Sequence, residues 1–183
     1  MLKTVEIEQL SVQVIREITS PAQGVVLIDC RIAREEEDEE PLTVPLHWRV
    51  GDWSKPPIDI ALDADTGRFQ SLQLVLQDET IERRVQPAID VATLTSETGI
   101  PVFERTLWNN GERYADERLQ PTPSWEGQSG LLVMFVPVPA LIIRACLVDK
   151  SLMFLLDERD EIIGFQLNQI TREEKRTIRW AAP

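Results

Sequence analysis

Apolar and polar residues alternate with a period of two along most of this chain, and this pattern limits the fold more than any other feature. Leucines occupy every second position of Leu72–Gln77, and the same spacing recurs in Val26–Ile32, Ile58–Leu62 and Ile163–Asn168. Successive side chains of a β-strand point to opposite faces, so such segments indicate strands with one buried and one wet face. The sequence therefore predicts an all-β, mainly antiparallel fold, a sandwich or two small packed sheets, with few short helices.

The apolar rows of these strands predict the core. We expect burial of one connected set: Val26, Ile28, Cys30, Ile32, Leu72, Leu74, Phe165 and Leu167. The segment 42–50 also alternates, with Leu42, Val44, Leu46, Trp48 and Val50 on one face and His47 and Arg49 on the other. It contains Pro45, which cannot donate a ladder hydrogen bond, so we expect this strand at a sheet edge.

Two local signals predict turns and caps. Asn110-Gly111 follows the apolar segment 102–108, and both residues tolerate the positive φ of a tight hairpin turn, so a hairpin is expected here. Thr171 and Glu174 have the spacing of a capping box, which predicts a helix of one or two turns.

Three short matches between the halves of the chain occur in the same order. Residues 24–28 match 130–134, Leu62-Asp63 matches Leu156-Asp157, and 72–74 matches 165–167. A tandem duplication would produce related halves 1–90 and 91–183 within one compact unit. The hairpins 58–76 and 152–170 would then superpose, with Asp63 and Asp157 at the same turn position. Strand–turn–strand patterns also recur by chance, so both interpretations stay open.

The second hairpin contains an acidic turn, the pair Ile162-Ile163, Gly164 and an alternating apolar strand. Residues 157–170 thereby resemble a hairpin motif of a family of small uncharacterised bacterial proteins. The first hairpin differs, because Ser71 stands where the glycine would fall. The resemblance implies a β-hairpin and a bacterial origin, and it supplies no catalytic residue.

The chain carries 31 Asp and Glu against 19 Lys and Arg, a net charge of −12. This charge repels phosphate backbones and anionic lipid surfaces, so we expect no nucleic acid and no membrane among the partners. The most apolar stretch, 130–143, contains Pro137 and Pro139 and is shorter than the ~20 residues of a membrane helix, so buried strands are expected there. Cys30 and Cys146 lack metal-binding or redox spacing, which favours a cytoplasmic protein, although one disulfide between them would also fit.

Two groups of residues are candidates for binding a partner. The first is the acidic run Glu35, Glu36, Glu37, Asp38, Glu39 and Glu40, whose adjacent like charges predict a solvated loop that would attract a basic protein. The second is Trp53 and Trp125, which lie beside Gly, Ser and Pro and are expected at the surface, whereas Trp48 lies on an apolar row and is expected in the core.

Catalytic and metal-binding patterns are weak. His47 is the only histidine, which excludes sites with several imidazoles, and Cys30 and His47 fall on opposite rows of their strands. We therefore expect an exposed histidine, buried unreactive thiols, no cofactor and no metal site. Residues 63–67 alternate carboxylates like a calcium loop, but Arg68 and Leu74 occupy the positions of the required Gly and Glu, so a hairpin turn is expected.

These observations lead to three hypotheses about function. The first is a non-enzymatic, acidic binding or assembly protein that engages a basic protein, for example by neutralising a cationic toxin. The second is a small hydrolase that acts on a neutral ligand through two carboxylates, although no pair is singled out by the sequence. Asp59 and residues 173–175 resemble the carboxylates and Lys of a metal-nuclease core, but their separation in the sequence and the net charge disfavour that chemistry. The third is a self-associating structural subunit. A pocket with two approaching carboxylates would favour the second hypothesis, and a flat acidic face would favour the first.

Overall fold

A computed structural model describes residues 1–33, 43–77, 81, 94–108, 111–136, 142 and 144–181. In these residues, two six-stranded sheets, a two-stranded sheet and a C-terminal helix confirm the predicted all-β, mainly antiparallel class. The elements are β1 (Thr4–Glu8), β2 (Val14–Ala22), β3 (Val25–Ile32), β4 (Leu46–Val50), β5 (Ile58–Leu62), β6 (Phe69–Gln77), β7 (Thr95–Thr98), β8 (Ile100–Phe103), β9 (Tyr114–Glu117), β10 (Thr122–Glu126), β11 (Gly130–Met134), β12 (Arg144–Leu147), β13 (Leu152–Leu156), β14 (Ile162–Leu167) and α1 (Arg172–Ala181).

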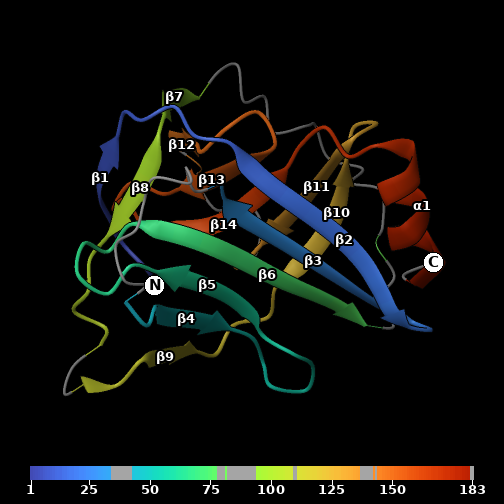
Figure 1. The fold of residues 1–183 in the computed structure, drawn as a ribbon, viewed down its shortest axis with the longest axis horizontal. Coiled ribbons are helices and arrows are strands. Elements are labelled where there is room, and N and C mark those ends of the chain that lie inside the picture. The colour runs from blue at the N-terminus through green and yellow to red at the C-terminus, as the bar shows by residue number, and fades with distance from the viewer. Residues whose placement is uncertain are drawn as a thin grey trace.

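The two large sheets lie one behind the other (Figure 1). The first sheet has the order β2-β3-β6-β5-β4-β9, and the second has the order β10-β11-β14-β13-β12-β7. Neighbouring strands are antiparallel except at one end of each sheet, where β4 pairs with β9 and β12 pairs with β7 in parallel. The short β1·β8 pair forms the third sheet.

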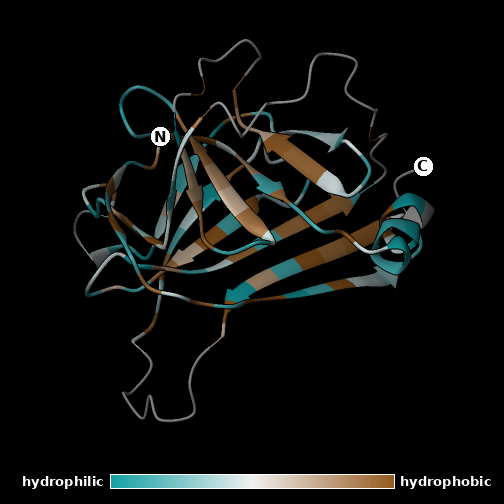
Figure 2. Ribbon diagram, turned by 90° about the horizontal axis from the view of Figure 1, so that it is seen from above, coloured by the Kyte–Doolittle hydropathy of each residue, from teal (hydrophilic) through white to brown (hydrophobic). Residues whose placement is uncertain are grey.

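The core lies between the two sheets, where apolar strand faces meet (Figure 2). The predicted core set is confirmed: Val26, Ile28, Cys30, Leu72, Leu74, Phe165 and Leu167 are buried, and Ile32 packs partly buried against them. Trp48 is also completely buried, as expected. Phe154 contacts both Phe69 and Phe103 edge-on, so aromatic rings link the two layers.

The second sheet differs from expectation on its outer face, which is buried rather than wet. Leu132, Met134, Ala145, Met153, Leu155 and Ile163 form a second apolar cluster there. Gln166, predicted on a wet face, is also buried. The alternation in Ile163–Asn168 therefore does not separate solvent from core, because both faces of β14 are covered.

The capping box at Thr171 is confirmed and opens a longer helix than expected. The Thr171 N–H donates to Glu174 Oε2 at 2.7 Å, and the Glu174 N–H donates to Thr171 Oγ1 at 3.2 Å. Arg16 of β2 donates to both Glu174 oxygens. The helix buries Ile178 at the end of the sandwich near β2 (Figure 1).

Two local expectations are wrong. β4 begins at Leu46, after Pro45, and lies between β5 and β9, so it is not an edge strand. Val44 is accordingly exposed rather than part of an apolar row. The segments around Asn110-Gly111 do not form a hairpin, because β8 pairs with β1 and β9 pairs with β4. Leu42 and Asn110 lie outside the described residues.

Five strands of each sheet have the same order, although the parallel end strand follows them in the chain in the first sheet (β9) and precedes them in the second (β7). The hairpins β5–β6 and β13–β14 also share details. Each has a register shift beside its last inner leucine, Leu62 or Leu156. Asp63 and Asp157 each accept backbone N–H groups in the turn that follows. The match of 24–28 with 130–134 disagrees with the strand pairing. The sequence match aligns Ile28 with Met134, but Ile28 pairs with Leu74, whereas Leu131 pairs with the equivalent Leu167. Duplication of the sequence itself stays a prediction.

Candidate functional site

The outer face of the first sheet carries polar side chains in two transverse rows. Antiparallel and parallel pairing place six residues in one row across the strands: Glu17, Asp29, Gln73, Asp59, Arg49 and Asp116. The neighbouring row is Ile15, Arg31, Ser71, Ala61, His47 and Tyr114. The first row, which we call the acidic row, has four carboxylates and one guanidinium. The second row adds Arg31, whose Nη2 donates to Glu17 Oε1 at 3.1 Å, so the two rows together hold four carboxylates against two guanidinium groups.

The equivalent positions of the second sheet hold a different set of residues. With the strands taken in the same order, the acidic row corresponds to Ser124, Leu132, Gln166, Met153, Leu147 and Thr98. No charged side chain is among them. The shared topology therefore does not require charges at these positions, and the acidic row is a property of the first sheet alone.

Four side chains at the β9 end of this face contact one another in a chain: His47, Tyr114, Arg49 and Trp53. We call these four residues the stacked cluster. The His47 Nδ1–H donates to Asp59 Oδ1 at 2.9 Å, which fixes the orientation of the imidazole ring. The His47 ring stacks on Tyr114 with centroids 5.1 Å apart and planes 25° apart. His47 is half-buried by these contacts rather than exposed as expected.

Arg49 and Trp53 complete the stacked cluster. The Arg49 guanidinium lies 4.5 Å from the Tyr114 ring centroid and 5.3 Å from that of Trp53. Its Nε and Nη2 donate to the two oxygens of Asp116, and this hydrogen bonding raises the pKa of Arg49. Trp53 is 42% exposed and Tyr114 is 52% exposed. Trp, Tyr and Arg are the residue types that contribute most to protein interfaces.

The loop after β4 holds Trp53 in an unusual conformation. Trp53 has a φ of 66°, the left-handed region that bulky residues rarely adopt. The flanking Asp52 accepts hydrogen bonds at Oδ1 from the Ser54 N–H and hydroxyl. These hydrogen bonds, the hydroxyl of Ser54 first, lower the pKa of Asp52 and keep the loop compact.

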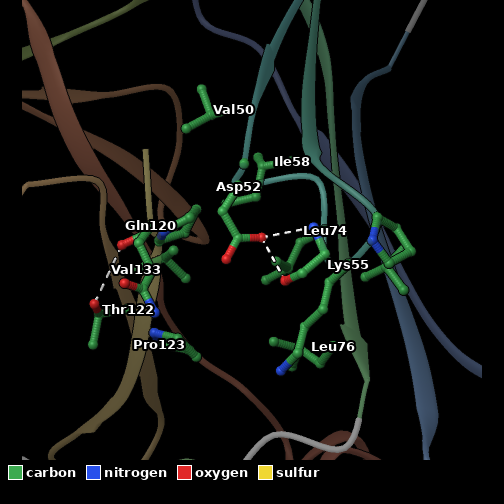
Figure 3. Close-up of a pocket in the computed structure, with 15 residues that line it drawn as sticks. Val50, Asp52, Lys55, Ile58, Leu74, Leu76, Gln120, Thr122, Pro123 and Val133 are labelled. Atoms are coloured by element: carbon green, nitrogen blue, oxygen red, sulfur yellow. Dashed lines mark hydrogen bonds between the residues drawn. The ribbon is translucent and has the colours of Figure 1, made fainter. Parts of the chain in front are cut away.

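The same loop borders a cleft of about 330 Å³ between the two sheets (Figure 3). Its apolar floor combines both sheets and consists of Val50, Ile58, Leu74, Leu76 and Val133. The rim is polar, with Asp52, Ser54 and Lys55 on one side and Gln120 and Thr122 on the other. Asp52 is the only carboxylate among the described lining residues, so this cleft lacks the pair that a hydrolase of this kind needs.

A shallower hollow at the edge strand β9 contains three acids, Glu112, Asp116 and Glu117. Two of them are already bonded. Glu117 accepts from the Trp48 indole at 3.0 Å and lies 2.9 Å from the Met1 amino nitrogen, while Asp116 binds Arg49. Asp116 and Glu117 are therefore engaged in structural contacts.

The residues predicted to bind a partner differ in where they lie. Glu35–Glu40 lie outside the described residues. Trp53 is exposed and belongs to the stacked cluster. The expectation that Trp125 lies at the surface is wrong, because it is 5% exposed. Lys175 and Arg179 of α1 lie over its ring at 4.7 and 5.8 Å, so the helix covers it.

The two cysteines are buried, and the acidic turn after β5 is closed by hydrogen bonds to Asp63. Cys30 and Cys146 are free and buried, and burial raises the pKa of each thiol to about 12. Asp63 accepts from the N–H groups of Asp65 and Thr66 in the turn after β5. Partial burial alone would raise the pKa of Asp63, but the bonds from Thr66 and Asp65 hold it low. Across the described ranges, no group of three or more His, Cys, Asp or Glu could hold a metal ion.

Sequence reasoning assigned no binding role to Arg49 or Tyr114. The alternation of β4 did place His47 and Arg49 on one polar face, which was the available signal. Tyr114 comes from β9, a short strand that joins β4 in parallel from 67 positions along the chain. Only the fold brings these side chains together.

No protein-family model matches the sequence, and the curated proteins likewise gave no match. The resemblance of residues 157–170 to a bacterial hairpin motif therefore stays a local one. Within the described ranges, no helix has both the length and the apolar character needed to cross a membrane. The functional argument rests on the geometry of the site.

Proposed function

We propose that this protein is a non-enzymatic binding protein that engages a basic protein partner through the outer face of its first sheet. The observation behind this proposal is the acidic row beside the stacked cluster. Carboxylates on this face would speed association with a cationic surface and disfavour acidic competitors. The acidic run Glu35–Glu40 would add to this attraction.

The stacked cluster supplies the second element of a protein interface. Its aromatic side chains are exposed, yet the Arg49–Asp116 and His47–Asp59 bonds already hold its polar members in place. Side chains ordered before association lose less entropy on binding. The cluster would therefore provide affinity, whereas the acidic row would provide attraction over longer distances.

The carboxylate arrangement favours this proposal over a hydrolase. The inter-sheet cleft has one described carboxylate, and Asp116 and Glu117 near β9 are bonded to Arg49 and Trp48. Free, buried Cys30 and Cys146 fit a reducing compartment, and we propose the cytoplasm.

Amide chemical-shift mapping tests the proposed face. The probe is a synthetic peptide of alternating glycine and arginine, added to the labelled full chain at low salt. We expect shifts at His47, Arg49, Asp59 and Gln73, and their reversal by added salt. Shifts confined to Glu35–Glu40 would place binding on the acidic run instead, and shifts scattered over all acidic surfaces would contradict a defined face.

A further inference from the structure

The stacked cluster ends at Trp53. His47 contacts Tyr114, Tyr114 contacts Arg49, and Arg49 contacts Trp53. The described part of the chain gives Trp53 no second ring or cation contact, and the residue is 42% exposed. Trp53 is therefore the last member of the chain of contacts, and part of its ring is exposed to solvent.

The backbone holds this surface open at a conformational cost. A φ of 66° is unfavourable for tryptophan, and strain of this kind persists where the surrounding structure and function require it. Gly51, two residues earlier, passes close to Pro57, and a Cβ at this position would lie 3.2 Å from Pro57 Cα.

Arg49 shows which chemical group this surface accepts. Its planar guanidinium lies over Trp53 and over Tyr114 while it pairs with a carboxylate. A guanidinium stacks on a ring with its flat face and keeps its N–H groups free for acceptors at its edge. An ammonium is more strongly hydrated and has no flat face, so it stacks less well.

We propose that the open surface of Trp53 receives an arginine side chain of the partner, which extends the stack by one more cation. This inference rests on the proposed function, since it specifies the partner as an arginine-bearing basic protein. The acidic row attracts the positive charge, and Trp53 distinguishes arginine from lysine.

The test compares peptides of alternating Gly-Arg and Gly-Lys with equal length and charge, titrated into the full chain. We expect the arginine peptide to bind roughly threefold to fivefold more tightly, as a partly exposed cation–π contact provides. The indole N–H signal of Trp53, assigned by its disappearance in Trp53→Phe, should shift with the arginine peptide.

Trp53→Leu should abolish the preference for arginine while both peptides still bind. Leu10→Ala, which removes an apolar side chain that is 46% exposed elsewhere, should preserve it. Equal binding of the two peptides to the unsubstituted protein would overturn the arginine site and leave the acidic face standing. Absence of binding by both peptides would overturn the proposed function itself.

Discussion

Arg49 and Asp116 form a bidentate ion pair across the parallel strands β4 and β9, with Nε–Oδ1 at 2.7 Å and Nη2–Oδ2 at 2.9 Å. The pair fixes the guanidinium where it contacts Tyr114 and Trp53. Because both side chains are partly exposed, solvent screens the pair and its contribution to stability is small. Its main effect is to order the stacked cluster.

Arg49→Lys keeps the charge but loses the planar, two-point contact. We expect the free energy of unfolding, measured in urea, to fall by less than about 1 kcal/mol. Affinity for the Gly-Arg peptide should fall by about threefold, because the cluster is no longer preorganised. Unchanged affinity would show that the order of the cluster does not matter for binding.

Phe165→Ala tests the packing between the sheets. Phe165 is completely buried and contacts Phe135, so its truncation should cost about 3–5 kcal/mol of unfolding free energy through lost transfer and a cavity. Leu10→Ala, at an exposed position, should cost less than about 0.5 kcal/mol. A loss below about 1 kcal/mol for Phe165→Ala would contradict the assigned strand phase.

The ionisation of Glu174 makes the free energy of unfolding depend on pH. Burial alone would raise the pKa of Glu174, but Arg16 and Thr171 lower it below its ordinary value of 4.5. Its stabilising contribution should therefore be complete above pH 4.5 and disappear as pH falls through the lower, folded-state pKa.

Glu174→Gln should remove this component. The difference in unfolding free energy between the two proteins should be largest near neutral pH and shrink below pH 4.5. A difference that stays constant over this range would show that Glu174 acts through packing or its neutral hydrogen bonds rather than its charge.

The two thiols should be unreactive in the folded protein. Burial raises the pKa of Cys30 and of Cys146 to about 12, so little thiolate exists near neutral pH. A colorimetric thiol reagent should label both cysteines only as fast as the protein unfolds, and labelling should accelerate with urea. Rapid labelling without denaturant would contradict the burial of these residues.

Local patterns predicted the inner faces of the strands well and the surfaces less well. The leucines of β6 and the capping box at Thr171 depend on neighbours in sequence, so alternation and spacing identify them. The burial of Gln166 depends on a second apolar layer over the sheet, which no strand pattern reports. The expected exposure of Trp125 was wrong for a similar reason, because Lys175 of α1, which lies 50 positions further along the chain, covers its ring.

The candidate site was predictable only in part. The polar row of β4 and the exposure of Trp53 follow from the alternation and the loop composition. The stacked cluster requires β9 beside β4, a parallel pairing that joins distant segments. The acidic row likewise combines residues from six strands, whose order depends on the topology.

The association rate of the Gly-Arg peptide tests the central claim most directly. One variant neutralises part of the acidic row (Glu17→Gln, Asp29→Asn, Asp59→Asn), and a matched variant neutralises three acids elsewhere that are exposed (Glu6→Gln, Glu158→Gln, Glu173→Gln). Both remove three negative charges. At low salt we expect the acidic-row variant to associate several-fold more slowly and with a weaker salt dependence. Its dissociation rate should also rise, because Asp59→Asn weakens the hydrogen bond that orders His47 in the stacked cluster. The matched variant should follow the unsubstituted protein, and equal slowing of both variants would contradict the account, because net charge rather than the face of the first sheet would then attract the partner.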